Sequence, residues 1–516
     1  MRQKLKAFVL PIFIMIIGIS ALFIHQLFEV KKTPQENWSR SLPLDYASDE
    51  KPLFFLQDKN LFISNKNKIE HFSVQDGLTI EKVKDIPTKV TRGYPFWTDG
   101  SQTIMIKDSN LVSTKNNKDT VLDNNVTGIA IHHSHIIYWK NEKAYTLNLE
   151  NQTSKEIHQF ESEIHNVYIA DDGSAIFAVM KDDVHASLYY LDETGSVLKD
   201  PFFTISQSPN DRVEGLVFSK QNDTLHLLYN HQSRTQGTIA YKINKLSVSL
   251  NDDKDSNIKP QEVSFLNEES NAKLEAPRSA KIVEIDGKKN ILFTAESHRI
   301  DAKNAISLYL APYTKGTDIT AKPISTTKNF GFAPIRVAGD SLVWFDYDGD
   351  SYELFGASQD KNVVAASKEW TDRSVKEGIN NAVLMLFSSL ITVLTSFYWV
   401  LPSLFLLILL YIFKPNAFEK DDINWVEYAS IIIFLVMPIT FISRAQSEYF
   451  HSVAPNYFSF TGSSWVWLLI ISVISGLIWK YGRNPEWGTF AGAFYFMGAY
   501  ILIFITSIGP YLFNLY

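Results

Sequence analysis

Long apolar segments lie at both ends of this 516-residue chain, and its middle contains none of comparable length. The first covers residues 8–28 and follows three basic residues, Arg2, Lys4 and Lys6. Four more cover residues 379–413, 426–443, 463–479 and 487–513. A helix needs about 20 apolar residues to cross the hydrocarbon core of a bilayer. The pattern therefore predicts an integral membrane protein with one N-terminal helix, a large middle domain and a C-terminal four-span domain over residues 379–516.

The N-terminal segment, residues 1–29, is predicted to remain as an uncleaved membrane anchor. A cleavable signal peptide has an apolar region of about 7–15 residues and then a small-residue cleavage site. Here the apolar run is longer, and its end from Ala21 to Phe28 lacks such a site.

Basic residues near the apolar segments predict the topology. If residues 379–413 cross once, one side of the membrane holds seven basic residues and the other holds only Arg444. If they cross twice, with a break at Pro402, the same basic residues are divided equally between the two sides. Cytoplasmic loops carry the excess of Lys and Arg. We therefore expect five spans in the cell membrane, with the N-terminus in the cytoplasm and the large domain and the C-terminus outside. The long segment would be tilted, or would lie partly on the membrane surface.

Within these spans a few residues are candidates for helix packing or for an intramembrane function. Gly488-x-x-x-Gly492 and Ser472-x-x-x-Gly476 have the spacing at which small residues let membrane helices approach closely. Packing inside one chain is the favoured interpretation, and contact between copies is the alternative. Glu427 is the single acidic residue in the predicted spans. It lies near the end of its segment, where we expect it to reach water, and an intramembrane functional carboxylate is the alternative.

Composition excludes several kinds of site. The chain has no cysteine, which rules out disulfides, thiolate metal sites and cysteine nucleophiles. A large exported domain without disulfides favours a bacterial envelope protein. The net charge is -7 and no basic stripe is present, so nucleic acid is not an expected partner.

Residues 50–366, between predicted linkers at 30–49 and 367–378, have the pattern of many short antiparallel strands. A loose unit recurs, in which a strand runs into an Asp-Gly type of turn and a more apolar strand. Tyr94–Ser101 followed by Gln102–Ile106 is one copy, and Val167–Ser174 followed by Ala175–Val179 is another. Units centred near residues 55, 97, 133, 171, 220, 286 and 340 have spacings near the ~40–50 residues of a four-stranded propeller blade.

The Asp-Gly-Ser turns followed by apolar strands resemble the blades of TolB-type and WD40-like propellers. That resemblance implies a seven-bladed β-propeller outside the cytoplasm, joined to an α-helical membrane bundle. The WD40 Gly-His and Trp-Asp signatures are missing. A β-sandwich, or a pair of β domains, is the alternative fold.

Two clusters in this domain have metal-ligand chemistry. His132, His133 and His135 follow one another closely, and on a strand His133 and His135 would share a face. No third ligand is evident, and a turn between two strands explains the cluster equally well. Asp346, Asp348 and Asp350 resemble part of a calcium loop, but the glycine is at the wrong position, which favours a hairpin turn.

No catalytic motif of the common hydrolases or nucleotide-binding enzymes is present, and no cofactor is expected. The leading hypothesis is a membrane-anchored binding or scaffolding protein whose propeller engages a protein, peptide or glycan of the envelope. The alternatives are a subunit of a transport or export system and, less favoured, an envelope hydrolase with a dispersed site.

Overall fold

The computed structural model describes residues 2–75, 77–192, 194–196, 200–250, 259–268, 271–297, 305–314, 316–337, 339–418, 425–445, 448–484 and 486–513. They form two compact units. Residues 33–297 and 305–368 make a β-rich unit, and residues 2–32 and 369–513 make a helical unit, within the described ranges.

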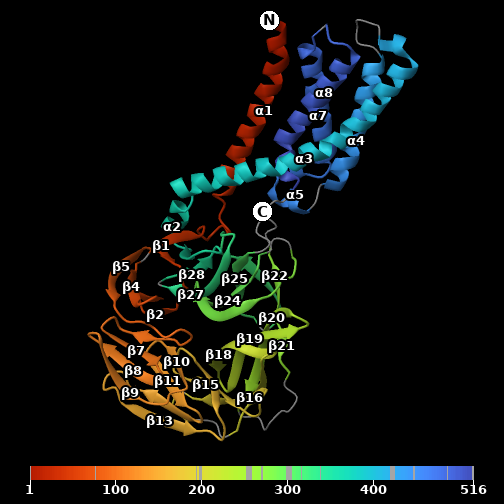
Figure 1. The fold of residues 1–516 in the computed structure, drawn as a ribbon. Coiled ribbons are helices and arrows are strands. Elements are labelled where there is room, and N and C mark those ends of the chain that lie inside the picture. Colours follow the sequence, from red (N-terminus) through yellow and green to blue (C-terminus); the bar gives the residue numbers. More distant parts are fainter. Residues whose placement is uncertain are drawn as a thin grey trace. The chain divides into compact units, whose positions relative to one another are not determined.

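The β-rich unit consists of antiparallel strands that mostly pair in the order in which they follow one another along the chain (Figure 1). Its first three sheets have four strands each. They are β2 (Phe54–Gln57), β3 (Asn60–Asn65), β4 (Lys68–Val74) and β5 (Ile80–Ile86); β6 (Trp97–Thr98), β7 (Gln102–Lys107), β8 (Asn110–Lys115) and β9 (Lys118–Asp123); and β10 (Gly128–His132), β11 (His135–Lys140), β12 (Lys143–Leu147) and β13 (Ser154–Gln159).

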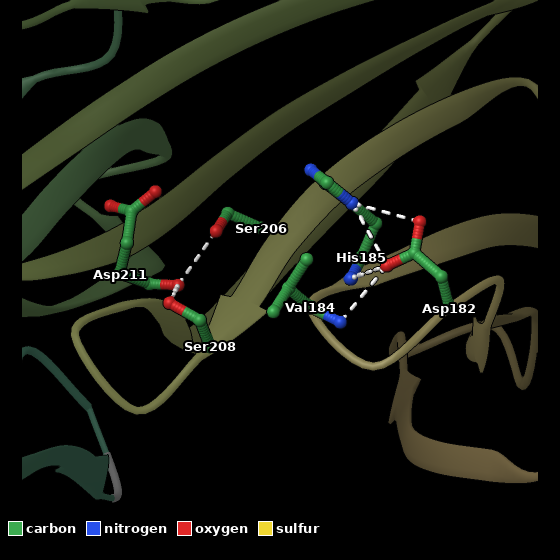
Figure 2. Close-up of polar contacts among 6 residues, drawn as sticks. All are labelled: Asp182, Val184, His185, Ser206, Ser208 and Asp211. Carbon is green, nitrogen blue, oxygen red and sulfur yellow. Dashed lines mark hydrogen bonds and ion pairs between the residues drawn. The ribbon is translucent and has the colours of Figure 1, made fainter.

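An eight-stranded sheet follows, and it consists of two successive groups of four. The strands are β14 (Ile164–Ile169), β15 (Ala175–Met180), β16 (His185–Leu191), β17 (Phe203–Ser208), β18 (Asp211–Gln221), β19 (Thr224–Thr235), β20 (Thr238–Ser249) and β21 (Gln261–Glu262). The groups join at β17 and β18, which share only two residue pairs. Figure 2 shows the hydroxyls of Ser206 and Ser208 donating to the carbonyl of Asp211 at this junction, at 2.7 and 3.2 Å.

The last sheet has nine strands and closes the unit. It contains β23 (Arg278–Ile285), β24 (Lys288–Glu296), β25 (Ile306–Pro312), β26 (Asp318–Pro323), β27 (Phe330–Val337), β28 (Ser341–Tyr347), β29 (Tyr352–Ser358), β1 (Leu42–Ser48) and, parallel to β26, β22 (Ser264–Asn267). The N-terminal strand β1 pairs with the C-terminal strand β29. The prediction that residues 30–49 are a linker is therefore wrong for Leu42–Ser48, which form a strand of the last sheet.

Shared hydrophobic cores connect each group of strands to the next and return to the start. One core joins the first three sheets. Each of four further cores joins one group of strands to the next, from β10–β13 with β14–β17 as far as β27–β29. The last core packs Val343 and Phe345 of β28 against Leu61 and Ile63 of β3. Because the last group packs on the first, the groups form a closed ring. This strand order is propeller-like, as the repeat predicts, and differs from the alternative β-sandwich.

Burial within a group follows from this arrangement. β7 and β8 are almost wholly buried, whereas β9, the fourth strand of that group, is largely exposed. β13 shows the same exposure. The middle strands lie between two neighbouring sheets, and the fourth forms the rim. Each predicted unit centre falls at or just before the turn between the first and second strands of a group.

The helical unit contains α1 (Arg2–Glu29), α3 (Asp372–Phe413), η2 (Pro415–Phe418), α4 (Trp425–Ala445), α5 (Glu448–Val453), α6 (Asn456–Ser459), α7 (Ser463–Gly482), α8 (Thr489–Ser507) and η3 (Gly509–Tyr511), while the short α2 (Lys361–Ala366) belongs to the β-rich unit. In Figure 1, α1, α7 and α8 run alongside one another and α3 lies obliquely to them. Four helices, α1, α3, α7 and α8, are long and apolar enough to cross a membrane, and α4 has a shorter apolar stretch, Trp425–Phe441.

α3 is continuous over 42 residues and does not reverse at Pro402. Thr371 caps its start, because its hydroxyl accepts the backbone N–H of Ser374 at 3.1 Å while the Ser374 hydroxyl accepts the N–H of Thr371. The last segment is shorter than its predicted range of 487–513, since α8 ends at Ser507 and a 3-10 turn follows.

Candidate functional site

The histidine cluster lies at the turn between β10 and β11. His132 is the last residue of β10 and pairs with His135, the first residue of β11. His133 occupies the turn between them with a positive φ of 49°. Nε2 of His132 lies 2.6 Å from Oδ1 of Asp171, and the rings of His132 and His133 meet edge to face with centroids 4.5 Å apart. The turn predicted for this cluster is therefore present.

The predicted pairing of His133 with His135 on one strand face does not occur, because His133 has left the strand. The His135 ring instead packs on Gly173 in the turn after β14, where an added Cβ would lie 2.7 Å from its Cε1. Ligand-capable atoms of His132, His133 and Asp171 all lie within 4.8 Å of one another. Asp171 is thus the partner that sequence reasoning missed.

A signal for Asp171 exists in the repeat. The predicted unit centres at 133 and 171 are equivalent turns of consecutive units, and equivalent turns of neighbouring blades come together around a ring. Aligning the units would have brought Asp171 beside the histidines.

The local charges shift two pKa values in this cluster. Burial, and then the neighbouring His132, lower the pKa of His133, so its imidazole stays neutral near pH 7. The hydrogen bond from His132 lowers the pKa of Asp171. Charged groups on two other turns also act here: Asp58 on His133, and Lys289 on Asp171.

The predicted calcium loop is a hairpin turn between β28 and β29. Oδ1 of Asp348 accepts the backbone N–H groups of Asp350 at 2.9 Å and Ser351 at 2.8 Å, so it shapes its own turn. Asp346 is buried in the sheet beside Gly331. The three carboxylates do not converge on one point, and in the described part of the chain the histidine cluster alone meets the geometric requirement for three metal ligands.

Asp346 is itself unusual. Its side chain is 1% exposed, Thr327 and Asn329 are nearby, and neither carboxylate oxygen makes a hydrogen bond of ordinary geometry with a described residue. Burial is the largest cause that raises the pKa of Asp346 to about 7.

Two surface cavities of the β-rich unit differ in charge. One, of about 510 Å³, lies beside β1 and is lined by Lys66, Lys68, Asp49 and Asp85 among others. These charges pair with each other, at 3.0 Å for Lys66 with Asp49 and 2.9 Å for Lys68 with Asp85. The cavity therefore presents little net charge.

The second cavity, called the basic pocket here, has a volume of about 550 Å³ and is lined by Ser219, Lys220, Gln221, His226, Lys288, Lys289, Asn290, Pro312 and Tyr313. No carboxylate belongs to this lining. Among the described residues, none of the three lysines has a carboxylate within 4.0 Å, in contrast to the first cavity. The Tyr313 hydroxyl is buried and makes no hydrogen bond of ordinary geometry, although Ser219 is nearby. The basic pocket thus offers uncompensated positive charge beside polar side chains.

In the helical unit, Glu427 does not reach water as expected; its side chain is 0% exposed. Nε1 of Trp479 donates to Oε1 of Glu427 at 2.9 Å, and Nη2 of Arg483 donates to Oε2 at 3.0 Å. The Arg483 side chain is only 10% exposed. The expectation of a water-exposed carboxylate is wrong because Arg483, which directly follows α7, supplies a largely buried cation from 56 positions away in the sequence.

The predicted small-residue contacts are only partly present. A Cβ on Gly492 would lie 2.0 Å from Oε1 of Glu427, so this glycine makes room for the ion pair. Gly476 and Gly488 have open space at the Cβ position, and Ser472 donates to the carbonyl of Leu468 in its own helix. Close helix contacts occur instead at glycines that the spacing did not single out, such as Gly18 against Thr506 and Gly378 against Leu27.

No protein-family profile and no curated protein matches the chain. Solved structures with some likeness include the N-terminal domain of Nup159, which is 9% identical, with 63% of this chain and 97% of that one covered and a TM-score of 0.38. The β-propeller domain of Myceliophteria thermophila Cps50 (Swd1) is 9% identical, with 60% and 98% covered and a TM-score of 0.37. The extracellular domain of the one component system BT4673 from B. thetaiotaomicron is 12% identical, with 62% and 40% covered and a TM-score of 0.36.

These likenesses are weak, with TM-scores below 0.5, and the fold is not argued from them. The strand order and the ring of shared cores carry the assignment independently. The β-rich unit is an all-β, propeller-like domain.

Proposed function

We propose that this chain is a membrane-held binding protein of the bacterial cell envelope, whose propeller outside the cytoplasm binds an acidic segment of a partner protein. The observation that carries the proposal is the basic pocket, with three lysines that lack a carboxylate within salt-bridge distance among the described residues. Uncompensated charge at a surface steers an oppositely charged partner and fixes its register. The basic pocket lies at the turns of two adjacent groups of strands, which suits an extended segment. The seven groups of strands are the proposed seven blades of the propeller.

The side chains of the helical unit support its insertion in a membrane. Apart from Met385, Trp399 and Leu407, the buried residues of α3 are small or hydroxyl-bearing, and they include Gly378, Ala382, Ser389, Thr392 and Ser396. The large apolar side chains of the same helix point outward, with Phe397 64% and Phe413 75% exposed. Water-soluble proteins rarely leave such continuous apolar surface uncovered, whereas membrane helices pack through small residues and show large ones to lipid.

The length of α3 supports one crossing. Forty-two residues extend about 63 Å at about 1.5 Å per residue, roughly twice the ~30 Å hydrocarbon core. A tilted helix with one end on the membrane surface uses that length without a second crossing. We therefore retain the topology with the N-terminus in the cytoplasm and the propeller and C-terminus outside.

Binding is tested with the purified full chain in detergent and a fluorescent ten-residue polyglutamate peptide. We expect salt-sensitive binding that Lys288→Glu with Lys289→Glu weakens by about tenfold or more. The control is Lys118→Glu with Lys155→Glu, which makes the same charge change on the exposed strands β9 and β13. Equal binding by both double variants would refute the pocket as the site. Stronger binding of a glycerol phosphate polymer than of the peptide would identify a glycan partner instead.

Topology is tested by cysteine labelling in intact cells, which is clean because the chain has no cysteine of its own. A membrane-impermeant maleimide should label Asn151→Cys in the propeller and leave Asn484→Cys unlabelled until the cells are opened. Labelling of Asn484→Cys in intact cells would contradict the five-span arrangement.

A transport or export subunit is the second candidate, and the Glu427–Arg483 pair is the observation that favours it. Ionisable residues inside membrane helices frequently mark an ion or proton path. The engagement of Glu427 by both Arg483 and Trp479 fits a structural role better, since the carboxylate is already neutralised. Proton flux into liposomes that depends on Glu427 would reverse this ranking.

A further inference from the structure

The β-rich unit contains several pairs of histidine and aspartate, and one differs from the others. His185 and Asp182 form an ordinary pair (Figure 2), in which Nδ1 of His185 lies 2.9 Å from Oδ1 of Asp182. The same oxygen also accepts the backbone N–H groups of Val184 and His185, both at 2.9 Å. This carboxylate is committed to the shape of its own turn. His231 and Asp211 make a further pair, at 2.6 Å, between neighbouring strands.

The pair of His132 and Asp171 has a different setting. The turn that carries Asp171 is shaped by its neighbour Asp172, whose Oδ1 accepts the N–H and the hydroxyl of Ser174 at 2.9 and 2.6 Å. Asp171 is therefore not needed for the turn, and within the described residues its side chain bonds only to His132. A second imidazole, that of His133, lies beside this pair and has no hydrogen-bond partner in the described ranges.

We propose that His132, His133 and Asp171 bind a divalent transition metal of the zinc class. The geometry places two imidazole nitrogens and one carboxylate oxygen within 4.8 Å of one another, on turns of two consecutive groups of strands. Two imidazoles and a carboxylate suit Zn²⁺, Co²⁺ or Ni²⁺, whereas Ca²⁺ and Mg²⁺ prefer six or more oxygen ligands. Three protein ligands leave at least one coordination position for water or for a group of a partner molecule.

The exposure of the site fits exchangeable metal. The Asp171 side chain is 91% exposed and that of His132 is 36% exposed, so an ion reaches the ligands directly from solvent. Binding requires neutral imidazoles and replaces the contact between His132 and Asp171. The charged groups facing the cluster are Asp58, His135 and Lys289.

The test uses the untagged full chain in detergent, stripped with a chelator and titrated with Co²⁺, whose visible absorption reports nitrogen ligation. We expect one equivalent to bind, with Zn²⁺ displacing it. His133→Ala and Asp171→Asn should each weaken Co²⁺ binding by about tenfold or more. The matched control, His185→Ala with Asp182→Asn, removes a histidine–aspartate pair that has no second imidazole and should bind Co²⁺ like the parent chain.

Unchanged Co²⁺ binding in His133→Ala or in Asp171→Asn would overturn the proposal, as would equal loss in the control. Absence of any binding at millimolar Co²⁺ would overturn it too. Circular dichroism of every variant should match the parent chain, because all the altered side chains lie in exposed turns; a variant that fails this check is replaced by His132→Gln, for which the same loss is expected.

Discussion

The two units of the molecule place their side chains in opposite ways. In the propeller, second strands such as β7 and β15 bury nearly every residue, and polar residues face outward on rim strands such as β9. In the helical unit, α3 buries small polar side chains such as Ser388, Thr392 and Ser403, all 0% exposed, while several of its large apolar side chains, such as Leu394 and Phe397, are more than 60% exposed. The exposed apolar side chains of α3 are the surface that the proposed insertion in a membrane would cover with lipid, whereas the propeller shows polar rim strands to water.

Buried polar groups are also satisfied differently in the two units. In the propeller, backbone groups of neighbouring strands form hydrogen bonds with each other. In the helices, hydroxyls return to backbone carbonyls of their own helix, as Ser396 does to Val393 at 2.6 Å. A few cross to another segment, such as Ser403 to the carbonyl of Ser430 at 2.7 Å and Ser388 to that of Pro510 at 3.1 Å. In the proposed membrane setting, where burial of apolar surface no longer drives association, such bonds would help to hold the helices together.

The largest effect should come from the closing strand of the propeller. Leu44 and Tyr46 of β1 are buried against the first and last groups. Replacing both with alanine should cost about 4 kcal/mol or more, because two large side chains leave the core that closes the ring. Limited proteolysis and intrinsic fluorescence would measure the loss. The control, Val83→Ala with Val121→Ala, changes side chains that are more than half exposed and should leave stability unchanged.

The next effect should appear in the helical unit alone. Glu427→Gln leaves the Arg483 cation buried without its counter-charge, and breaking one side of a buried pair costs about 3–5 kcal/mol. Thermal denaturation in detergent should show the helical unit weakened and the propeller transition unmoved. Glu427→Gln with Arg483→Met should recover part of the loss. If Glu427→Gln alone were as stable as the parent chain, the ion pair would be dispensable.

A smaller effect should separate two glycines that look alike in sequence. Gly492→Ala should destabilise the helical unit by about 1–3 kcal/mol, because the added methyl collides with the Glu427 carboxylate. Gly476→Ala meets open space and should be neutral. Both are measured by the same denaturation assay. Destabilisation by Gly476→Ala would point to a contact with a second copy of the chain.

The smallest effect tests Asp346, which at 1% exposure is more deeply buried than Glu70 at 7%. The pKa of Asp346 is raised to about 7, so the folded state holds a proton that the unfolded state releases near pH 4. Stability contributed by this proton is complete below about pH 4 and is lost as the pH rises to about 7. Asp346→Asn should therefore stabilise the propeller by about 1–2 kcal/mol at pH 8 and flatten its pH dependence. Asp350→Asn, in the exposed turn, is the control, and the same gain there would contradict the burial argument.

The propeller could be predicted because its signals are local. Alternation of apolar residues and Asp-Gly turns repeat within each group, and the predicted unit at residue 171 coincides with the turn after β14. Strand β1 was missed although Leu42, Leu44 and Tyr46 alternate, because its partner β29 lies some 300 positions later in the chain. The same holds for Glu427 and Arg483, whose pairing depends on how α4 and α7 pack.

Part of the metal cluster was within reach of the sequence, and part was not. The sequence singled out His132, His133 and His135 as candidate ligands. Which of these histidines join the cluster depends on where β10 ends. Element boundaries are the least certain part of any such prediction.

The pairing of β1 with β29 also sets how the propeller responds to mechanical load. Leu42 lies opposite Gly356 and Ser48 opposite Tyr352, so the chain enters β1 and leaves β29 at the same end of the ladder. Tension between α1 and α3 would pull these two ends apart and would break the ladder hydrogen bonds one after another, as a zipper opens. The bonds between Ser39 and Ser358, at 2.9 and 3.0 Å, stand at the loaded end and would carry the force first. The ring would therefore open at low force when its two tethers separate, even though shared cores join its groups.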